Sequence, residues 1–299
     1  MDRFAAMQMF IRVVELQSFT RAARSLQIPK STMSATVREL EARLQVKLLN
    51  RTTRHVSPTA DGTAYYERAV RLLQDLDDIE TAVRQAVTSP RGRLRVDMPT
   101  VIAQRLVMPQ LPHFFRDYPA IQLELGCTDR PVDLIQEGVD CVVRGGALHD
   151  VSLVARKIAE LENITCAAPD YLARHGHPKT LEDLDDHVFV NYFSVQTGKM
   201  VGNDFEKGGT KQMVKGRHMV AVNDSEAYIT GGLAGLGLIQ MPRFAIQHYV
   251  EAGQLTPVMT QYSAGLTPIY VLYPQNRHLS AKVRVFSDWV AGLFKALPQ

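Results

Sequence analysis

Apolar residues recur every three or four positions in the first part of the chain, and this spacing predicts three helices. The predicted helices cover residues 4–14, 20–27 and 31–44. Ser18 or Thr20 caps the second helix, because a short hydroxyl side chain accepts a hydrogen bond from a free N–H group of the first turn. Pro29 follows the second helix and ends it, since proline biases the preceding residue away from the helical conformation. The predicted buried positions are Phe4, Met7, Phe10, Ile11, Val14, Ala22, Ala23, Met33, Val37, Leu40 and Leu44.

The next segment combines β-branched and basic side chains, so residues 46–58 are predicted to form a short hairpin. From residue 59 onward the chain carries a long apolar stripe at helical spacing. A helix with such a stripe and no domain of its own needs a partner. We therefore expect residues 59–89 to form a linker helix that joins two copies of the chain. Pro90 and Gly92 end it and indicate a hinge.

Beyond residue 93 the pattern changes to strands that alternate with helical segments. A first set of predicted strands covers residues 94–98, 121–125 and 141–143. A second set covers residues 163–168, 188–191, 219–222 and 237–240. A late strand at 269–273 precedes a final amphipathic helix at 283–297. This rhythm predicts a mostly parallel sheet with covering helices.

Charge is distributed unevenly along the chain. The 299 residues are 45% apolar and 22% charged, which excludes a disordered protein, and their length predicts two or three domains. The formal net charge is only +3, yet residues 1–58 contain ten Lys and Arg against four Asp and Glu. A basic head on a near-neutral body is typical of a protein that binds a polyanion.

Other features argue against export, a membrane helix and a zinc site. The longest uncharged run, residues 252–276, contains three prolines and many polar residues, so it cannot form a membrane helix. Arg12 and Glu15 interrupt the apolar stretch that a signal peptide would need. The three cysteines are far apart and give neither zinc-site spacing nor a disulfide framework. We expect a cytoplasmic protein with no metal and no cofactor.

A short helix, a turn and a second helix within a basic segment are typical of a helix-turn-helix. The second helix must present small and polar side chains at its N-terminal end, so that they reach base edges. Cations and hydroxyls around it contact phosphates. Arg54 lies at the hairpin tip, from which a winged variant enters the minor groove. The residues predicted to contact DNA are Thr20, Lys30, Ser31, Thr32, Ser34, Arg38, Arg51 and Arg54.

Five segments at fixed spacing resemble the LysR-type transcriptional regulators. They are residues 10–16 (FIRVVEL), 18–26 (SFTRAARSL), 34–41 (SATVRELE), 48–51 (LLNR) and 57–62 (SPTADG). Weaker likeness continues at residues 140–145 (DCVVRG) and 235–242 (GLGLIQMP). The chain departs from the family in the turn, where Pro29 and Lys30 replace a hydroxyl residue and Gln. Lys30 therefore reaches either a guanine or only a phosphate.

The resemblance implies a multidomain α+β fold and a function in transcription. Residues 1–58 would form a winged helix-turn-helix, followed by the linker helix at 59–89. The C-terminal effector-binding region would consist of two α/β subdomains like those of periplasmic binding proteins, residues 92–162 with 268–299, and residues 163–267. Such regulators form homodimers or homotetramers, bind interrupted palindromes in double-stranded DNA, take a small-molecule effector and can contact RNA polymerase.

The resemblance also suggests which side chains face the effector cleft, since ligands of α/β domains bind at the carboxyl ends of strands. Plainer interpretations stand beside these. Thr100 and Ser225 can serve only as helix caps, Arg144 can form an internal salt bridge, and Phe193 can belong to the core. The predicted effector residues are Thr100, Thr128, Arg144, Phe193, Asn223, Asp224 and Ser225.

Other functions fit the sequence less well. Residues 196–199 (QTGK) lack the glycine and the hydroxyl residue of a phosphate-binding loop, and no GxSxG or GxGxxG motif is present, so we expect no enzyme activity. A cysteine-based redox sensor has only Cys166 in the second predicted subdomain. A solute-binding protein of a transporter would not carry the basic head. The remaining alternative is an architectural DNA-binding protein without a physiological ligand.

Overall fold

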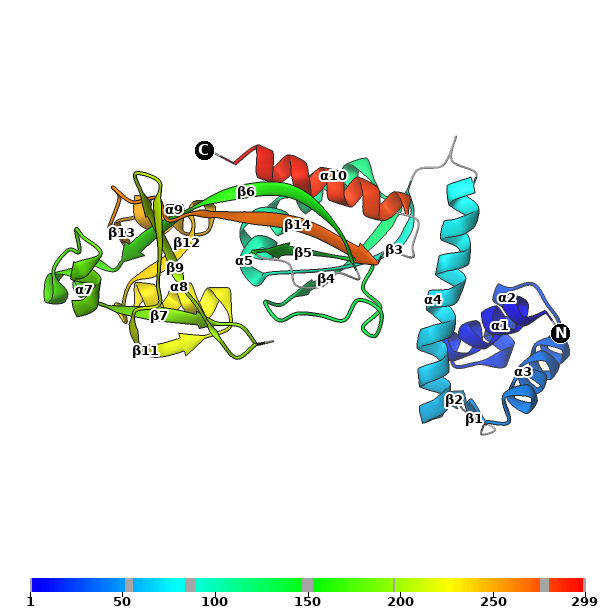
Figure 1. The fold of residues 1–299 in the computed structure, drawn as a ribbon. Helices are drawn as coiled ribbons and strands as arrows, with labels where there is room; N and C mark the ends of the chain where they lie inside the picture. Colours follow the sequence, from blue (N-terminus) through cyan, green and yellow to red (C-terminus); the bar gives the residue numbers. More distant parts are fainter. Residues whose placement is uncertain are drawn as a thin grey trace. The chain divides into compact units, whose positions relative to one another are not determined.

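The computed structural model describes residues 2–51, 56–83, 90–146, 153–195, 197–274 and 280–297. The chain divides into two compact units, Met1–Thr88 and Ser89–Gln299. Figure 1 labels most elements of both. The elements of the first unit are α1 (Arg3–Leu16), α2 (Phe19–Ser25), α3 (Lys30–Leu44), β1 (Leu49–Arg51), β2 (Val56–Pro58) and α4 (Ala60–Val83).

The three predicted helices of the first unit are present, with ends shifted by one or two residues. Ser18 is the cap of α2: its hydroxyl accepts a hydrogen bond from the N–H of Arg21 at 3.3 Å, so the choice of Ser18 over Thr20 is resolved. Ala22 and Ala23 are buried between helices, where small side chains allow close packing. The predicted core largely holds, but Phe4 and Leu44 are 43% and 40% exposed, because they lie in terminal turns. The buried side chains of this core are Phe10, Val13, Ala22, Ala23, Met33, Val37, Leu40, Leu48 and Leu49.

The predicted hairpin consists of β1 and β2, which pair antiparallel. Its tip, including Arg54, lies outside the described residues. The hydroxyl of Thr59 donates to the carbonyl of Lys47 at 2.8 Å and accepts from the N–H of Gly62 at 2.9 Å. A Cβ at Gly62 would lie 1.9 Å from the carbonyl oxygen of Leu48, so only glycine fits there. The hairpin is thus held tightly against the start of α4, whose predicted last turn, residues 84–89, is outside the described residues.

The second unit contains a seven-stranded, a three-stranded and a two-stranded sheet, with helices packed on their faces (Figure 1). Helix α10 (Ala281–Lys295) packs against β3 (Gly92–Met98) and β6 (Leu153–Ala167), and α9 (Arg243–Glu251) packs against β6 and β12 (Ile239–Pro242). Its strands are β3 (Gly92–Met98), β4 (Ile121–Cys127), β5 (Cys141–Gly145), β6 (Leu153–Ala167), β7 (Val188–Phe193), β8 (Met200–Val201), β9 (Asn203–Lys207), β10 (Thr210–Val214), β11 (Arg217–Val222), β12 (Ile239–Pro242), β13 (Thr256–Pro257) and β14 (Leu266–Pro274). Its helices are α5 (Thr100–Ile102), the π-helical η1 (Ala103–Val107), η2 (Met108–Gln110), α6 (Leu111–Asp117), α7 (Pro169–His175), η3 (Glu182–Asp186), α8 (Ser225–Leu233), α9 (Arg243–Glu251) and α10 (Ala281–Lys295).

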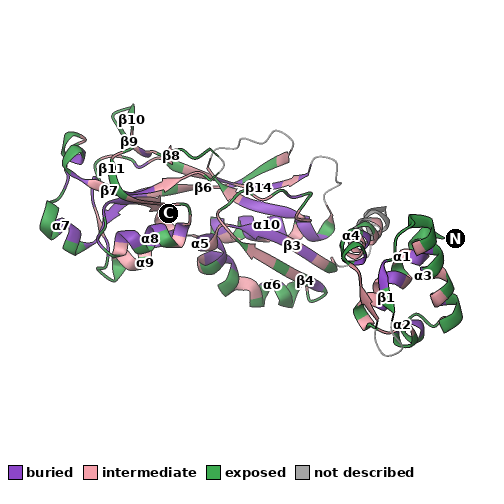
Figure 2. Cartoon of the chain, turned by 90° about the horizontal axis from the view of Figure 1, so that it is seen from below, coloured by how far each residue is buried: buried purple, intermediate pink, exposed green. Residues whose placement is uncertain are grey.

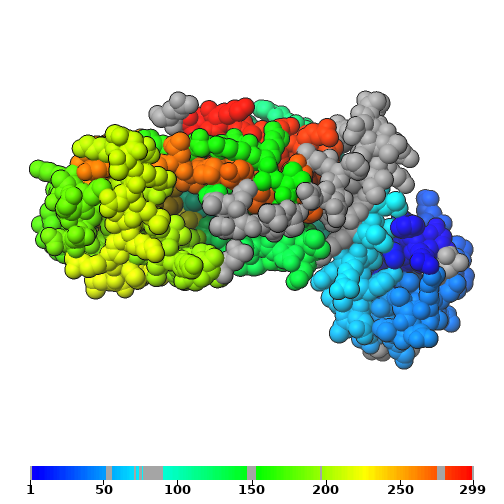
Figure 3. Space-filling model, viewed as in Figure 1, coloured from blue at the N-terminus to red at the C-terminus, as the bar shows by residue number. Residues whose placement is uncertain are grey.

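The expectation of a mostly parallel sheet is wrong. In the seven-stranded sheet, ordered β12-β6-β14-β5-β3-β4 with β13 beside β6, only β3 pairs in parallel, with β4 and β5. Strand β14 runs antiparallel to both β5 and β6. Figure 3 shows the β6 and β14 segments, green and orange, side by side on the surface of the second unit. The alternation of strands and helices predicted the wrong strand direction, because β14 lies between β5 and β6 although it follows β5 by more than a hundred residues in the sequence.

Strand β6 is also much longer than predicted. Only its last part was expected, whereas it begins at Leu153. Its first half includes exposed charged residues such as Arg156 and Lys157, so it lacks the apolar run by which the end of the strand was recognised. The β9–β10 hairpin was not predicted either, although Gly208 and Gly209 form its turn with positive φ angles of 60° and 80°.

The main core of the second unit extends from the seven-stranded sheet to β7 and α8. One continuous cluster joins Leu94 and Val96 of β3 to Val190 of β7 and Ile229 of α8. Figure 2 shows this as buried positions along β3, β14 and α10. Among the described residues no helix is both long and apolar enough to cross a membrane.

Candidate nucleic-acid interface and effector site

The first turn of α3 exposes polar side chains while its opposite face is buried. Met33, Val37 and Leu40 are at most 3% exposed and fix this helix in the three-helix core. Pro29 occupies the capping position and offers no side-chain cap, which leaves the first N–H groups of α3 free of a side-chain partner. Polar residues predicted to contact DNA and exposed on α2 and α3 are Thr20, Lys30, Ser31, Thr32 and Arg38.

Ser34 and Arg38 form a pair on the second and third turns of α3. The guanidinium of Arg38 donates to the hydroxyl of Ser34 at 3.2 Å. Ser34 is half-buried, whereas Arg38 is exposed. The hydroxyl of Ser34 is therefore oriented by Arg38 and lies one turn beyond the exposed Lys30 and Ser31.

Arg51, predicted to contact phosphate, is engaged within the protein. Its guanidinium donates to a carboxylate oxygen of Glu41 at 2.6 Å and lies 5.0 Å from the centre of the Phe19 ring. The other oxygen of Glu41 accepts the backbone N–H groups of Leu48 and Leu49, both at 3.0 Å. Sequence reasoning missed Glu41, although a glutamate ten residues before an arginine at the start of the hairpin was a visible signal.

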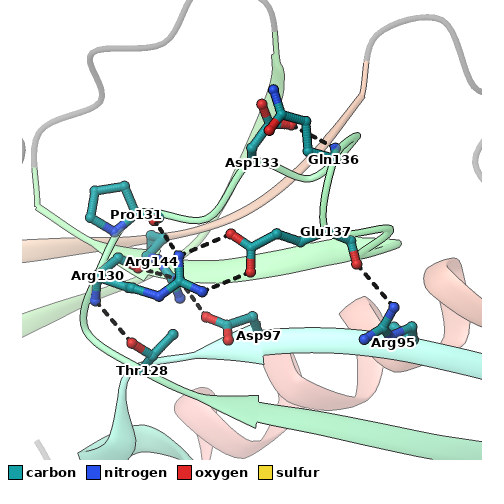
Figure 4. Close-up of polar contacts among 9 residues, drawn as sticks. All are labelled: Arg95, Asp97, Thr128, Arg130, Pro131, Asp133, Gln136, Glu137 and Arg144. Carbon is teal, nitrogen blue, oxygen red and sulfur yellow. Dashed lines mark hydrogen bonds and ion pairs between the residues drawn. The ribbon is translucent and has the colours of Figure 1, made fainter. Parts of the chain in front are cut away.

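In the second unit, Arg144 forms the internal ion pair that was the plainer interpretation. Its guanidinium bonds to Asp97 and to the carbonyl of Arg130, the latter at 3.1 Å (Figure 4). Asp97 is 6% exposed, and burial raises the pKa of its carboxyl even though Arg144 opposes this. A Cβ at Gly126 on the adjacent strand would lie 2.3 Å from that carboxylate, so Gly126 makes room for it.

The loop after β4 is organised around Arg130. Its guanidinium forms two bonds with Glu137, at 2.9 and 2.7 Å, and its N–H donates to the hydroxyl of Thr128 at 3.2 Å (Figure 4). Arg130 holds the pKa of Glu137 below its usual range. The hydroxyl of Thr128 thus stabilises the loop that carries the carbonyl bound by Arg144.

Helix α8 begins beside this loop. Asp224 caps it by accepting from the N–H of Ala227 at 2.8 Å. Ser225 is the first helical residue and not the cap; its N–H and its hydroxyl both donate to one oxygen of Asp129, at 2.7 and 2.8 Å. Burial raises the pKa of Asp129. The start of α8 is therefore joined to the end of β4 through a half-buried carboxylate that sequence reasoning missed.

Tyr192, in a segment whose aromatic side chains were candidates for lining the cleft, extends the same cluster. Its hydroxyl donates to the carbonyl of Asn223 at 2.9 Å, and its pKa is raised by burial and by the nearby Asp129 and Asp224. Arg144 opposes that shift, so its charge also acts on Tyr192. The structure thus gathers Arg144, Asn223, Asp224 and Ser225 around Asp129 and Tyr192.

Two predicted effector residues are not joined to this cluster by a hydrogen bond or ion pair within the described residues. Thr100 was expected to cap the helix after β3, but Pro99 occupies the capping position and Thr100 is the first helical residue. Phe193 ends β7 and pairs with Met200; it is half-buried and points to the face opposite Tyr192, because side chains alternate along a strand.

A second connection to α8 comes from the π-helical segment η1, and it was also missed. Arg105 donates from one nitrogen to both oxygens of Glu226, at 3.0 and 2.9 Å, and contacts His248 at 2.8 Å. Its guanidinium lies 5.2 Å from the centre of the Tyr249 ring. Asp129 and Arg105 thus bind two successive residues of α8, Ser225 and Glu226. In the part of the chain described, no three His, Cys, Asp or Glu side chains converge as metal ligands.

Comparison with known proteins identifies the family to which both units belong. Residues 4–63 match the family of bacterial regulatory helix-turn-helix proteins, lysR family, and residues 88–295 match the LysR substrate binding domain. YhjC of Escherichia coli (strain K12), described as an uncharacterized HTH-type transcriptional regulator, is 42% identical over 295 residues, which cover 99% of each chain. A Pseudomonas aeruginosa protein described as an HTH-type transcriptional repressor is 39% identical over 299 residues, which cover 100% of this chain and 94% of the repressor.

A solved structure extends the likeness to the fold of the whole chain. CrgA, a LysR-type transcriptional regulator from Neisseria meningitidis, is similar with a TM-score of 0.61 and 30% sequence identity. The match covers 97% of this chain and 98% of CrgA. The predicted fold class, a winged helix-turn-helix with a linker helix and an α/β effector-binding region, is confirmed. The chain belongs to the LysR family of DNA-binding transcriptional regulators, in which a helix-turn-helix domain is joined to an effector-binding domain.

Proposed function

We propose that two copies of the chain read an interrupted palindrome, each with the first turns of α3 in the major groove and its hairpin on the flanking DNA. The observation that carries this proposal is the exposure of Lys30, Ser31 and Thr32 opposite a buried face of α3. Small polar side chains at a helix N-terminus let the helix approach base edges closely. Ser34 would contribute to sequence preference, whereas Thr20, Arg38 and Arg54 would contact phosphates.

In this proposal α4 joins the two copies. Leu72 of α4 is apolar and 45% exposed, which favours a partner helix. A dimer would supply two heads and a tetramer four. The bound assembly would act on transcription through contact with RNA polymerase.

The effector would bind at the cluster of Arg144, Asp129 and Ser225, with Thr128, Asn223 and Asp224 at its border and Thr100 and Phe193 as further candidates. This site would lie between the subdomains formed by residues 92–162 with 268–299 and by residues 163–267. A ligand that replaces Asp129 at Ser225 would change how α8 is held against the end of β4. It shifts the balance between two assemblies only through its difference in affinity for them.

A footprint on the DNA upstream of the gene tests the DNA part of the proposal. We expect two protected half-sites separated by about one helical turn, about 10 base pairs, or a multiple of it. Ser34→Ala should lose the specific footprint while retaining most affinity for random DNA. Arg43→Ala, which changes an exposed charge at the far end of α3, is the control. A single continuous protection that does not depend on sequence would instead support the architectural alternative.

A further inference from the structure

We infer that Glu41 is a positioning residue for DNA binding, which fixes the hairpin relative to α3 through Arg51. This inference rests on the proposed function, because it assumes that the hairpin contacts DNA. Glu41 carries the same charge as DNA and would be expected to weaken binding if it acted only as a surface charge. Its contacts point to the opposite effect.

Within the described residues, the Glu41 carboxylate accepts hydrogen bonds from residues at the start of the hairpin. One oxygen accepts the N–H groups of Leu48 and Leu49, and the other accepts from Arg51. Leu48 and Leu49 are 2% and 4% exposed, so their N–H groups would lie unpaired near the core without this acceptor. A single side chain of α3 therefore sets where β1 begins and how it is oriented.

Arg51 completes the connection on the outer side. Its side chain is 30% exposed and that of Glu41 only 13%, so the pair is partly shielded from water. The guanidinium also lies over the ring of Phe19, in the first turn of α2. Arg51 thus joins β1 to both helices of the helix-turn-helix. Its positive charge is already paired with the carboxylate of Glu41. It acts on DNA by holding the hairpin rather than as an independent phosphate contact.

For the Glu41→Gln substitution, this assignment and simple electrostatics predict opposite changes in DNA affinity. Glu41→Gln removes a negative charge, and charge alone would make DNA binding tighter and more salt-dependent. We expect about tenfold weaker binding to the specific site, because the displaced hairpin loses a phosphate contact. The same loss should lower the slope of log binding constant against log salt concentration by about 0.9. No positive charge is removed, so a decrease in slope reports a displaced hairpin.

The experiment is a salt titration of DNA anisotropy with the full chain. Glu39→Gln, an exposed carboxylate two residues earlier on α3, is the matched control and should bind as tightly as the original chain or slightly tighter. The double variant Glu41→Gln with Arg51→Gln should bind no more weakly than the weaker single variant, because each residue acts through the other. Thermal unfolding checks that each variant is folded at the temperature of the assay.

Different failures have different meanings. If Glu41→Gln binds as tightly as the original chain, or if the losses of the two single variants add, the inference is overturned. Should Glu41→Gln not fold, Arg51→Lys replaces it: it keeps the charge but not the planar group that fits both Glu41 and Phe19, so weaker binding supports the inference and unchanged binding overturns it. Arg54→Ala separates the two levels, because an unchanged affinity in that variant would contradict the hairpin contact on which the inference depends.

Discussion

The strongest test of how the second unit is held together is removal of the Arg105–Glu226 ion pair. Arg105→Ala loses both bonds to Glu226 and the contact with the Tyr249 ring. The two side chains are 17% and 26% exposed, between the surface and the interior. Exposed pairs contribute about 0.2–1 kcal/mol, and breaking a buried pair costs about 3–5 kcal/mol. We therefore expect a loss of about 2 kcal/mol for Arg105→Ala.

The sequence itself supplies the assay. Trp289 is the only tryptophan and lies in α10, packed 4.8 Å from the ring of Phe114, so its fluorescence reports unfolding of the second unit alone. With an m-value of about 2–3 kcal/mol per molar urea, the midpoint should fall by about 0.7–1 M. Arg116→Ala, whose pair with Asp117 is exposed, should change stability by less than about 0.5 kcal/mol.

A double-mutant cycle decides whether the pair itself matters. Arg105→Ala and Glu226→Gln should together cost less than the sum of the two single variants by about 1–2 kcal/mol. Additive losses would show that Arg105 stabilises the unit through its contacts with His248 and Tyr249 and not through Glu226. That result would refute the reasoning that these two residues bind α8 to the π-helical segment.

Three further predictions follow from local geometry. Gly62→Ala should destabilise the first unit by about 1–3 kcal/mol in thermal unfolding, because the added Cβ would clash with the Leu48 carbonyl. Gly292→Ala, where the added Cβ meets no other atom, should leave stability unchanged or increase it. Equal effects of the two substitutions would contradict this prediction. Burial lowers the pKa of His187, so the unfolded state binds a proton first as pH falls below 6.5, and the stability of the fold decreases there. In urea unfolding, His187→Gln should make this decrease smaller. An identical pH profile of stability for the variant and the original chain would contradict the prediction. Burial raises the pKa of all three cysteine thiols, but Cys127 is exposed whereas Cys141 and Cys166 are buried, so a thiol reagent should modify Cys127 first in the native chain. Simultaneous reaction of all three would show that the buried thiols are accessible.

The first unit was largely predictable from sequence because its signals are local. Helical periodicity and a hydroxyl cap lie within one or two turns, so the stripe of Met33, Val37 and Leu40 and the cap at Ser18 could be identified directly. The role of Arg51 could not, because its partner Glu41 acts across a turn on two N–H groups whose positions depend on the folded hairpin.

The second unit was less predictable because its contacts join distant residues. Arg144 was singled out, but its partner Asp97 lies 47 positions away. Ser225 was also singled out, yet Asp129, which accepts its two hydrogen bonds, is 96 positions away. Strand alternation fixes which residues share a face, but it does not fix which strands become neighbours. For the same reason the return of β14 between β5 and β6 had no signal in the local pattern.

The central claim, that this chain reads DNA sequence with the first turns of α3, is tested most directly by competition. Labelled DNA from upstream of the gene is titrated with the full chain in the presence of excess random DNA, and anisotropy is measured for the original chain and for Ser34→Ala. The account predicts binding that survives the competitor for the original chain and is largely lost for Ser34→Ala, while both bind random DNA similarly. Binding that the competitor abolishes in both, or equal survival in both, would contradict it.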